Sequence, residues 1–92
     1  MKNLTKEFAN KVYDVLVTHL RADERMRDDF IYHHVESKEG CHEYRFMGNL
    51  GFGGKYWSET NTVSCYLEDE TQGRKELIKI ANKELSLIEK DV

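Results

Sequence analysis

The chain has 92 residues, a length that predicts one domain, 1–92, with a modest core. Its 39% hydrophobic and 11% aromatic content argues against a disordered chain. A net charge of −3 argues against a general nucleic-acid binder. No apolar run approaches the ~20 residues of a membrane span, and the N-terminus has no apolar core of the signal-peptide kind, so we expect a cytoplasmic protein without a membrane partner.

The N-terminal part of the chain predicts helices. Apolar residues recur at helical spacing over 4–20, which indicates an amphipathic helix with Asn3 as its N-cap. The pattern then changes, and Asp23 is placed to cap a short second helix over 24–29, with Met26 and Phe30 facing inward.

The middle of the chain predicts antiparallel strands. Residues 30–36 are rich in aromatic and β-branched side chains, and a turn cluster follows at 37–40. Residues 41–47 then alternate in character, as in a strand with two different faces. The alternation places His42, Tyr44 and Phe46 on one face and Glu43 and Arg45 on the other.

A second hairpin and a second long helix complete the predicted order. Residues 55–59 and 62–67 form the hairpin around Thr60 and Asn61, and its buried face is expected to carry Val63, Cys65 and Leu67. Residues 72–89 have a helical apolar stripe, and Thr71 is the expected cap. The fold class is therefore α+β: a two-layer sandwich in which N-terminal and C-terminal helices pack on an antiparallel sheet of three to four strands.

The glycine-rich segment 48–57, GNLGFGGKYW, holds four of the six glycines. It does not fit a phosphate-binding loop, because the lysine is displaced by one position and Tyr56 follows it where a hydroxyl residue is needed. It also fails the dinucleotide pattern, so no cofactor is expected. Two explanations remain. The glycines allow positive φ in a wide connection or bulged hairpin, or they form a recognition loop with the neighbouring aromatic residues.

Metal and catalytic sites are not predicted. His33, His34, Cys41, His42 and Cys65 fall on neighbouring candidate strands, but they lack the spacing of zinc motifs. The two cysteines are expected to be free thiols. A catalytic pair of a Cys65 nucleophile and a His42 or His34 base would need a reactive thiol. The strand pattern places Cys65 on the buried face, where a thiol is inert. The acids at 68–70 suit the start of a helix, so they need no magnesium or acid–base role. We therefore expect no enzyme.

Binding to a protein is the function that the residues favour. The expected contact residues are rigid aromatics with a lysine, and an acidic triplet that would meet a basic patch: Phe52, Lys55, Tyr56, Trp57, Glu68, Asp69 and Glu70. The alternative is a module for single-stranded RNA or DNA. It would stack bases on the aromatic face of Tyr44, Phe46, Tyr56 and Tyr66. An exposed edge strand would also allow a homodimer.

The run from Tyr44 to Leu85 (YRFMGNLGFGGKYW, then CYLEDET, Arg74 and Asn82) resembles small proteins carried by phages and other mobile elements. That resemblance implies an anti-defence factor of the anti-CRISPR kind. Such a factor blocks a bacterial nuclease or another nucleic-acid-processing complex by stoichiometric contact in the host cytoplasm. The chain departs from the very acidic inhibitors that mimic DNA, so overall charge is not the expected basis of inhibition.

Overall fold

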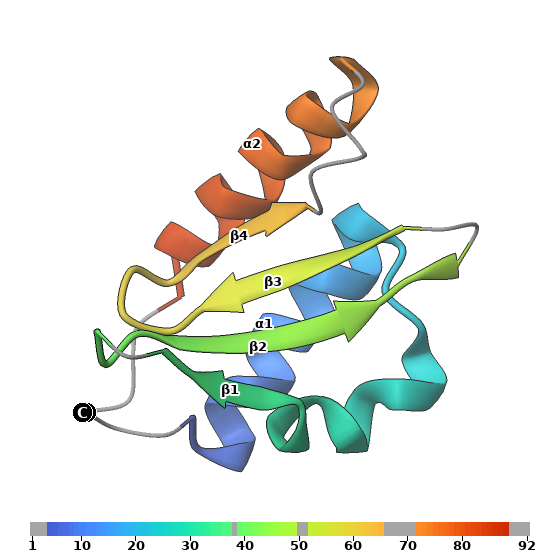
Figure 1. Ribbon diagram of the computed structural model, residues 1–92. Coiled ribbons are helices and arrows are strands. Elements are labelled where there is room, and N and C mark those ends of the chain that lie inside the picture. The colour runs from blue at the N-terminus through green and yellow to red at the C-terminus, as the bar shows by residue number, and fades with distance from the viewer. Residues whose placement is uncertain (1–3, 38, 50–51, 66–71, 89–92) are drawn as a thin grey trace.

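The computed structural model describes residues 4–37, 39–49, 52–65 and 72–88 (Figure 1). The elements in chain order are helix α1 (Lys6–Leu20), the 3-10 helix η1 (Glu24–Tyr32), strands β1 (His34–Glu36), β2 (His42–Met47), β3 (Gly53–Trp57) and β4 (Thr62–Cys65), and helix α2 (Gln72–Ser86). The strands form one antiparallel sheet in the order β1-β2-β3-β4, and both α-helices lie on the same side of it (Figure 1). The predicted α+β class is confirmed.

Helix α1 begins two residues later than the sequence pattern predicts. The hydroxyl of Thr5 accepts a hydrogen bond from the backbone N–H of Phe8 at 3.1 Å, so Thr5 is the N-cap. The predicted cap, Asn3, lies outside the described residues. The helix ends where Arg21 adopts a left-handed conformation, with φ of 54°. Its inner face carries six buried residues: Phe8, Ala9, Val12, Tyr13, Leu16 and Leu20.

The segment after Asp23 corrects the strand predicted over 30–36. Asp23 caps η1 as expected, because its carboxylate accepts from the backbone N–H of Arg25 at 2.9 Å. The helix continues to Tyr32, and only His34–Glu36 pair with β2. Phe30 explains the difference. Its ring is buried in the core under the sheet while its backbone is helical, so an aromatic residue here does not indicate a strand.

Aromatic rings form the centre of the core. The Phe30 ring lies 5.2 Å from that of Tyr13, 5.8 Å from that of Tyr44 and 6.3 Å from that of Tyr56, measured between centroids. Burial raises the pKa of Tyr13 to about 12, with a smaller contribution from the carboxylates of Asp23 and Glu24. Burial also raises the pKa of Tyr56, again helped by neighbouring groups. Both phenols therefore hold their protons more tightly in the folded chain.

The raised tyrosine pKa values predict a loss of stability in alkali. An unfolded tyrosine ionises near pH 10, whereas Tyr13 in the folded chain stays neutral to about pH 12. The stabilisation is therefore complete below pH 10 and is lost as the pH rises from 10 toward 12. Urea unfolding at a series of pH values should show this decline. Tyr13→Phe should make it shallower, while Tyr32→Phe, whose ring is exposed, should leave it unchanged. Equal slopes for the two variants would contradict the assignment.

The glycines of the 48–57 segment are needed for close approach, and the expected positive φ is wrong for those that are described. Among the described glycines, only Gly40 has a positive φ, of 80°. A Cβ on Gly48 would lie 2.6 Å from the carbonyl oxygen of Phe52 and 2.8 Å from that of Arg21. At Gly54 it would meet the backbone of β4 and, at 3.1 Å, the Phe46 ring. The strand β3 already begins at Gly53, two residues before the predicted start.

The β2–β3 connection is clamped by the chain that follows α1. Asp23 donates its backbone N–H to the carbonyl oxygen of Met47 at 2.9 Å, and Asn49 donates to that of Arg21, also at 2.9 Å. Ala22 and Gly48 face each other as a single antiparallel bridge. A short piece of chain thus runs beside the end of β2, and it leaves no room for a side chain on Gly48.

The outer edge of β4 is closed by a side chain of α2. Asn82 accepts from the backbone N–H of Val63 at 2.7 Å and donates to the carbonyl oxygen of the same residue at 3.3 Å. The amide therefore takes the position of a neighbouring strand. Helix α2 spans Gln72–Ser86, shorter than the predicted 72–89, and its side chains described as buried are those of Ala81 and Leu85. The predicted cap Thr71 and core residue Leu67 lie outside the described residues.

Candidate functional site

One face of the sheet is covered by no helix or strand of the described chain. The helices pack on the other face, as the view in Figure 1 shows. Residues directly opposite each other in an antiparallel sheet share a face, so the register fixes the members of this surface. We call it the open sheet face, and it consists of Val35, Glu43, Arg45, Met47, Lys55, Trp57, Thr62 and Ser64.

A carboxylate shared by two cations organises the centre of the open sheet face. The Glu43 side chain is only 12% exposed. Its Oε2 lies 3.3 Å from Nε of Arg45 and 3.4 Å from Nζ of Lys55. Because a buried carboxylate is stabilised only when it is paired, Glu43 holds both cations against the sheet. The Arg45 side chain is still 52% exposed, so it can contact a second molecule.

The Trp57 ring is fixed beside these charges. Its indole Nε1 donates to the hydroxyl of Ser64 at 3.1 Å, and Nζ of Lys55 lies 5.8 Å from the ring centroid. The ring is only partly buried. Two apolar side chains border the surface, Met47 at 56% exposure and Val35 at 39%. A rigid, partly exposed tryptophan beside arginine and methionine is the composition typical of protein interfaces.

The predicted contact residues do not form one surface. Lys55 and Trp57 lie together on the open sheet face. Tyr56, between them in sequence, points into the core, and its side chain is fully buried. It is therefore removed from the set of surface contacts, and its phenol donates to the side chain of Asn61 at 2.7 Å. The acidic residues Glu68, Asp69 and Glu70 lie outside the described residues.

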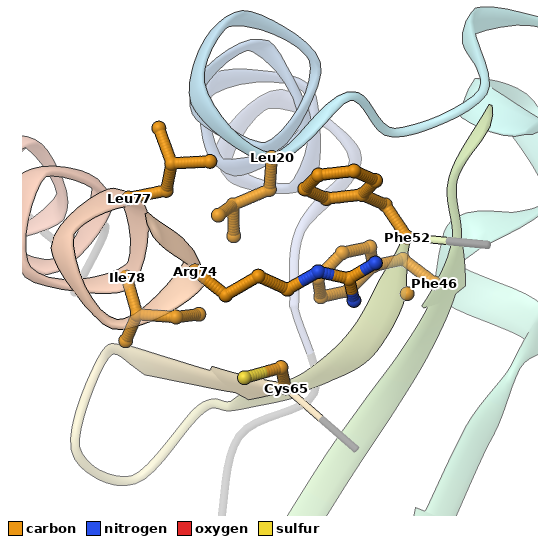
Figure 2. A pocket seen from close by; sticks show the side chains of 8 residues that line it. Leu20, Phe46, Phe52, Cys65, Arg74, Leu77 and Ile78 are labelled. Atoms are coloured by element: carbon orange, nitrogen blue, oxygen red, sulfur yellow. The ribbon is translucent and has the colours of Figure 1, made fainter. Parts of the chain in front are cut away.

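Phe52 closes one end of the core on the helix side of the sheet. Figure 2 shows its ring beside the side chain of Arg74, and the guanidinium carbon lies 3.8 Å from the ring centroid. The guanidinium carbon of Arg21 lies 4.9 Å from the same centroid. The lining residues of this cleft are Leu20, Phe46, Phe52, Gly53, Cys65, Arg74, Leu77 and Ile78. Its free volume is about 10 Å³, the space of one water molecule, so it offers no room for a larger ligand.

A larger cleft of about 300 Å³ lies between α1 and η1. Arg27 lines it, but the guanidinium is already used within the chain. It bonds the carboxylate of Glu24 through two nitrogens, contacts Asp14 at 2.7 Å and donates to the backbone oxygen of Asn10 at 3.2 Å. With its donors engaged in this way, the arginine is part of the α1–η1 packing.

The histidines and cysteines are distributed over the fold. Nε2 of His34 contacts Nδ1 of His42, and the two rings are parallel with centroids 4.6 Å apart. Cys65 lies opposite Gly54, and Gly54 faces Phe46 on β2. Phe46 is four positions from His42 along that strand, a distance of roughly 13 Å, so the thiol and this imidazole are not neighbours. In the described part of the chain, no three His, Cys, Asp or Glu side chains are grouped so that they could hold a metal ion.

The aromatic platform of the nucleic-acid alternative is also redistributed. Tyr44, Phe46 and Tyr56 share a face, as the alternation predicts, but that face is the core, and none of the three is more than 3% exposed. Their rings are not accessible to stacked bases. Tyr66 lies outside the described residues. Among the described residues of the open sheet face, Trp57 is the one aromatic side chain on which a base could stack.

Sequence reasoning missed Arg45, Glu43 and Met47 as members of the same surface as Trp57. The signal was present in part, because the alternation of 41–47 separates Glu43 and Arg45 from the core residues. Joining them to Lys55 and Trp57 requires the register between β2 and β3, which pairs Glu43 with Trp57 and Arg45 with Lys55.

Comparisons with models of protein families, with curated proteins and with solved structures found no match. Among the described residues, no helix is both long enough and apolar enough to cross a membrane.

Proposed function

We propose that this chain is a non-enzymatic binding protein that acts by stoichiometric contact with a protein partner through the open sheet face. The observation that carries the proposal is the fixed, partly exposed Trp57 beside Arg45 and Met47, on a face that no described helix or strand covers. Interfaces of this composition place most of their affinity in a few rigid aromatic and arginine residues.

The resemblance of the 44–85 run to anti-defence proteins selects the class of partner to test first. We propose an inhibitor of the anti-CRISPR kind that blocks a bacterial nuclease or another nucleic-acid-processing complex. The charge of the open sheet face supports protein contact over nucleic-acid contact. Arg45 and Lys55 share the carboxylate of Glu43, which reduces the positive potential available to phosphates.

The first test is capture of partners from a bacterial lysate that contains CRISPR effector complexes. Wild-type protein and Trp57→Ala are compared as baits, and a captured complex is then purified and titrated by calorimetry. Trp57→Ala is expected to weaken binding at least about thirtyfold, the effect of losing a central interface tryptophan. Trp57→Phe, which keeps a ring but loses the bond to Ser64, should lose less.

The matched control is Leu87→Ala, because Leu87 is 71% exposed and lies beyond the end of α2. It should bind as wild type, and circular dichroism should show all variants folded. Equal binding by wild type and Trp57→Ala would remove the open sheet face from the proposal. Titration with mixed single-stranded oligonucleotides at low salt separates the alternative. Binding that falls steeply with added salt and is lost in Trp57→Ala would favour the nucleic-acid module.

A further inference from the structure

The two edges of the sheet differ in how their backbone groups are satisfied. At the β4 edge, the Asn82 amide bonds both the N–H and the carbonyl of Val63. At the other edge lies β1, the lowest strand in Figure 1. Its three residues pair with β2, and no described residue pairs with their outer side. Unpaired edge groups can accept another strand.

The hydrogen-bond pattern shows which backbone groups of β1 point outward. Ser37 donates to Cys41 at 2.8 Å, and Arg45 donates to His33 at 3.0 Å. Bonded pairs alternate along an antiparallel ladder, so Val35 directs its backbone groups toward β2. His34 and Glu36 must therefore direct their N–H and carbonyl groups away from the sheet.

We propose that this edge binds a second copy of the chain, with the two β1 strands antiparallel and the twofold axis at Val35. In this register, His34 and Glu36 of one copy form bonded pairs with Glu36 and His34 of the other. Val35 faces its own equivalent as a non-bonded pair. The outward backbone groups are then all used, and the two sheets become one continuous eight-stranded sheet, about twice the width of either.

Side-chain complementarity favours a second copy over an unrelated strand. Directly opposite residues share a face, so each His34 ring lies opposite a Glu36 carboxylate of the other copy. That carboxylate is 61% exposed and lies 3.8 Å from Nε2 of His42 in its own chain. The self-pairing of Val35, which is 39% exposed, buries apolar surface on the open sheet face. A His-Val-Glu sequence is self-complementary in this register, because its central residue meets itself and its polar ends meet each other.

Sedimentation over a range of protein concentrations tests the assembly. Wild type is expected to show a reversible monomer–dimer equilibrium. Glu36→Pro removes an outward N–H from each copy without removing a bond to β2, and it should raise the dissociation constant at least about tenfold. Glu36→Gln keeps that N–H and should dimerise much more strongly than the proline variant. A monomer at every concentration up to about millimolar for the wild type would overturn the proposal.

A cross-linking experiment tests the register and does not depend on the proline variant folding. With Cys41 and Cys65 replaced by serine, Val35→Cys places two thiols across the twofold axis. A non-bonded antiparallel pair has Cα atoms about 4.5 Å apart, which suits a disulfide. Oxidised glutathione should then yield a covalent dimer of Val35→Cys and little dimer of Leu87→Cys. Equal cross-linking of both would contradict the register. Neither result bears on Trp57, so this inference and the proposed function can fail separately.

Discussion

Replacing Phe30 with alanine is expected to lower the free energy of unfolding by about 3–5 kcal/mol, the largest single side-chain effect that we expect in this chain. The ring is buried and contacts three tyrosine rings contributed by α1, β2 and β3. Removing it leaves a cavity where four elements meet. Urea unfolding followed by circular dichroism measures the loss, and the variant should unfold at a much lower urea concentration than wild type.

Tyr32→Ala is the matched control for the Phe30 variant. Tyr32 belongs to the same 3-10 helix, but its side chain is 76% exposed. Its removal should change stability by less than about 0.5 kcal/mol. A similar loss in the two variants would mean that the helix as a whole, rather than the buried ring, sets the stability of this region.

Replacing Gly48 with alanine is expected to cost about 3 kcal/mol. The added Cβ would lie within 3 Å of two carbonyl oxygens and of the Phe52 Cβ. Two of these contacts are with backbone, so no side-chain rotation relieves them. The strand that ends at Met47 and the clamp formed by Arg21 and Asp23 would have to separate. Thermal unfolding should show a large decrease in the melting temperature.

Gly73 provides the opposite case within the same chain. A Cβ built there has no atom within 4 Å, and the residue lies in the first turn of α2. Gly73→Ala should therefore raise stability by about 0.5–1 kcal/mol, because alanine loses less backbone entropy in a helix. If both alanine variants destabilise the protein to the same extent, the close-approach argument at Gly48 fails.

The elements were largely predictable from local pattern. The amphipathic stripes gave both α-helices, and alternation in 41–47 correctly separated Tyr44 and Phe46 from Arg45. The inward orientation of Phe30 was predicted correctly, but its assignment to the start of a strand was wrong. Aromatic residues favour strands on average, whereas this ring is held by tertiary packing beneath the sheet. Strand propensity depends on the residue type and does not reflect a contact with a residue far away in the sequence.

The candidate site was predictable only in part. Lys55 and Trp57 were identified from residue type, and strand geometry places Tyr56 on the opposite face from both. Which face is the core depends on the register with β2 and on where the helices pack. The pairing of Glu43 with Trp57 is a contact between residues 14 positions apart, and no short motif specifies it.

The contact between Asn82 and Val63 has a consequence for how the molecule opens. One side chain of α2 supplies both hydrogen bonds to the outer side of Val63, so this part of the strand edge is covered only while the helix is docked. A transient release of α2 would bare the backbone of β4 and let the Val63 amide exchange with solvent. The same excursion would expose an unpaired strand edge to other chains, and the Asn82 carboxamide covers that part of the edge while α2 is docked.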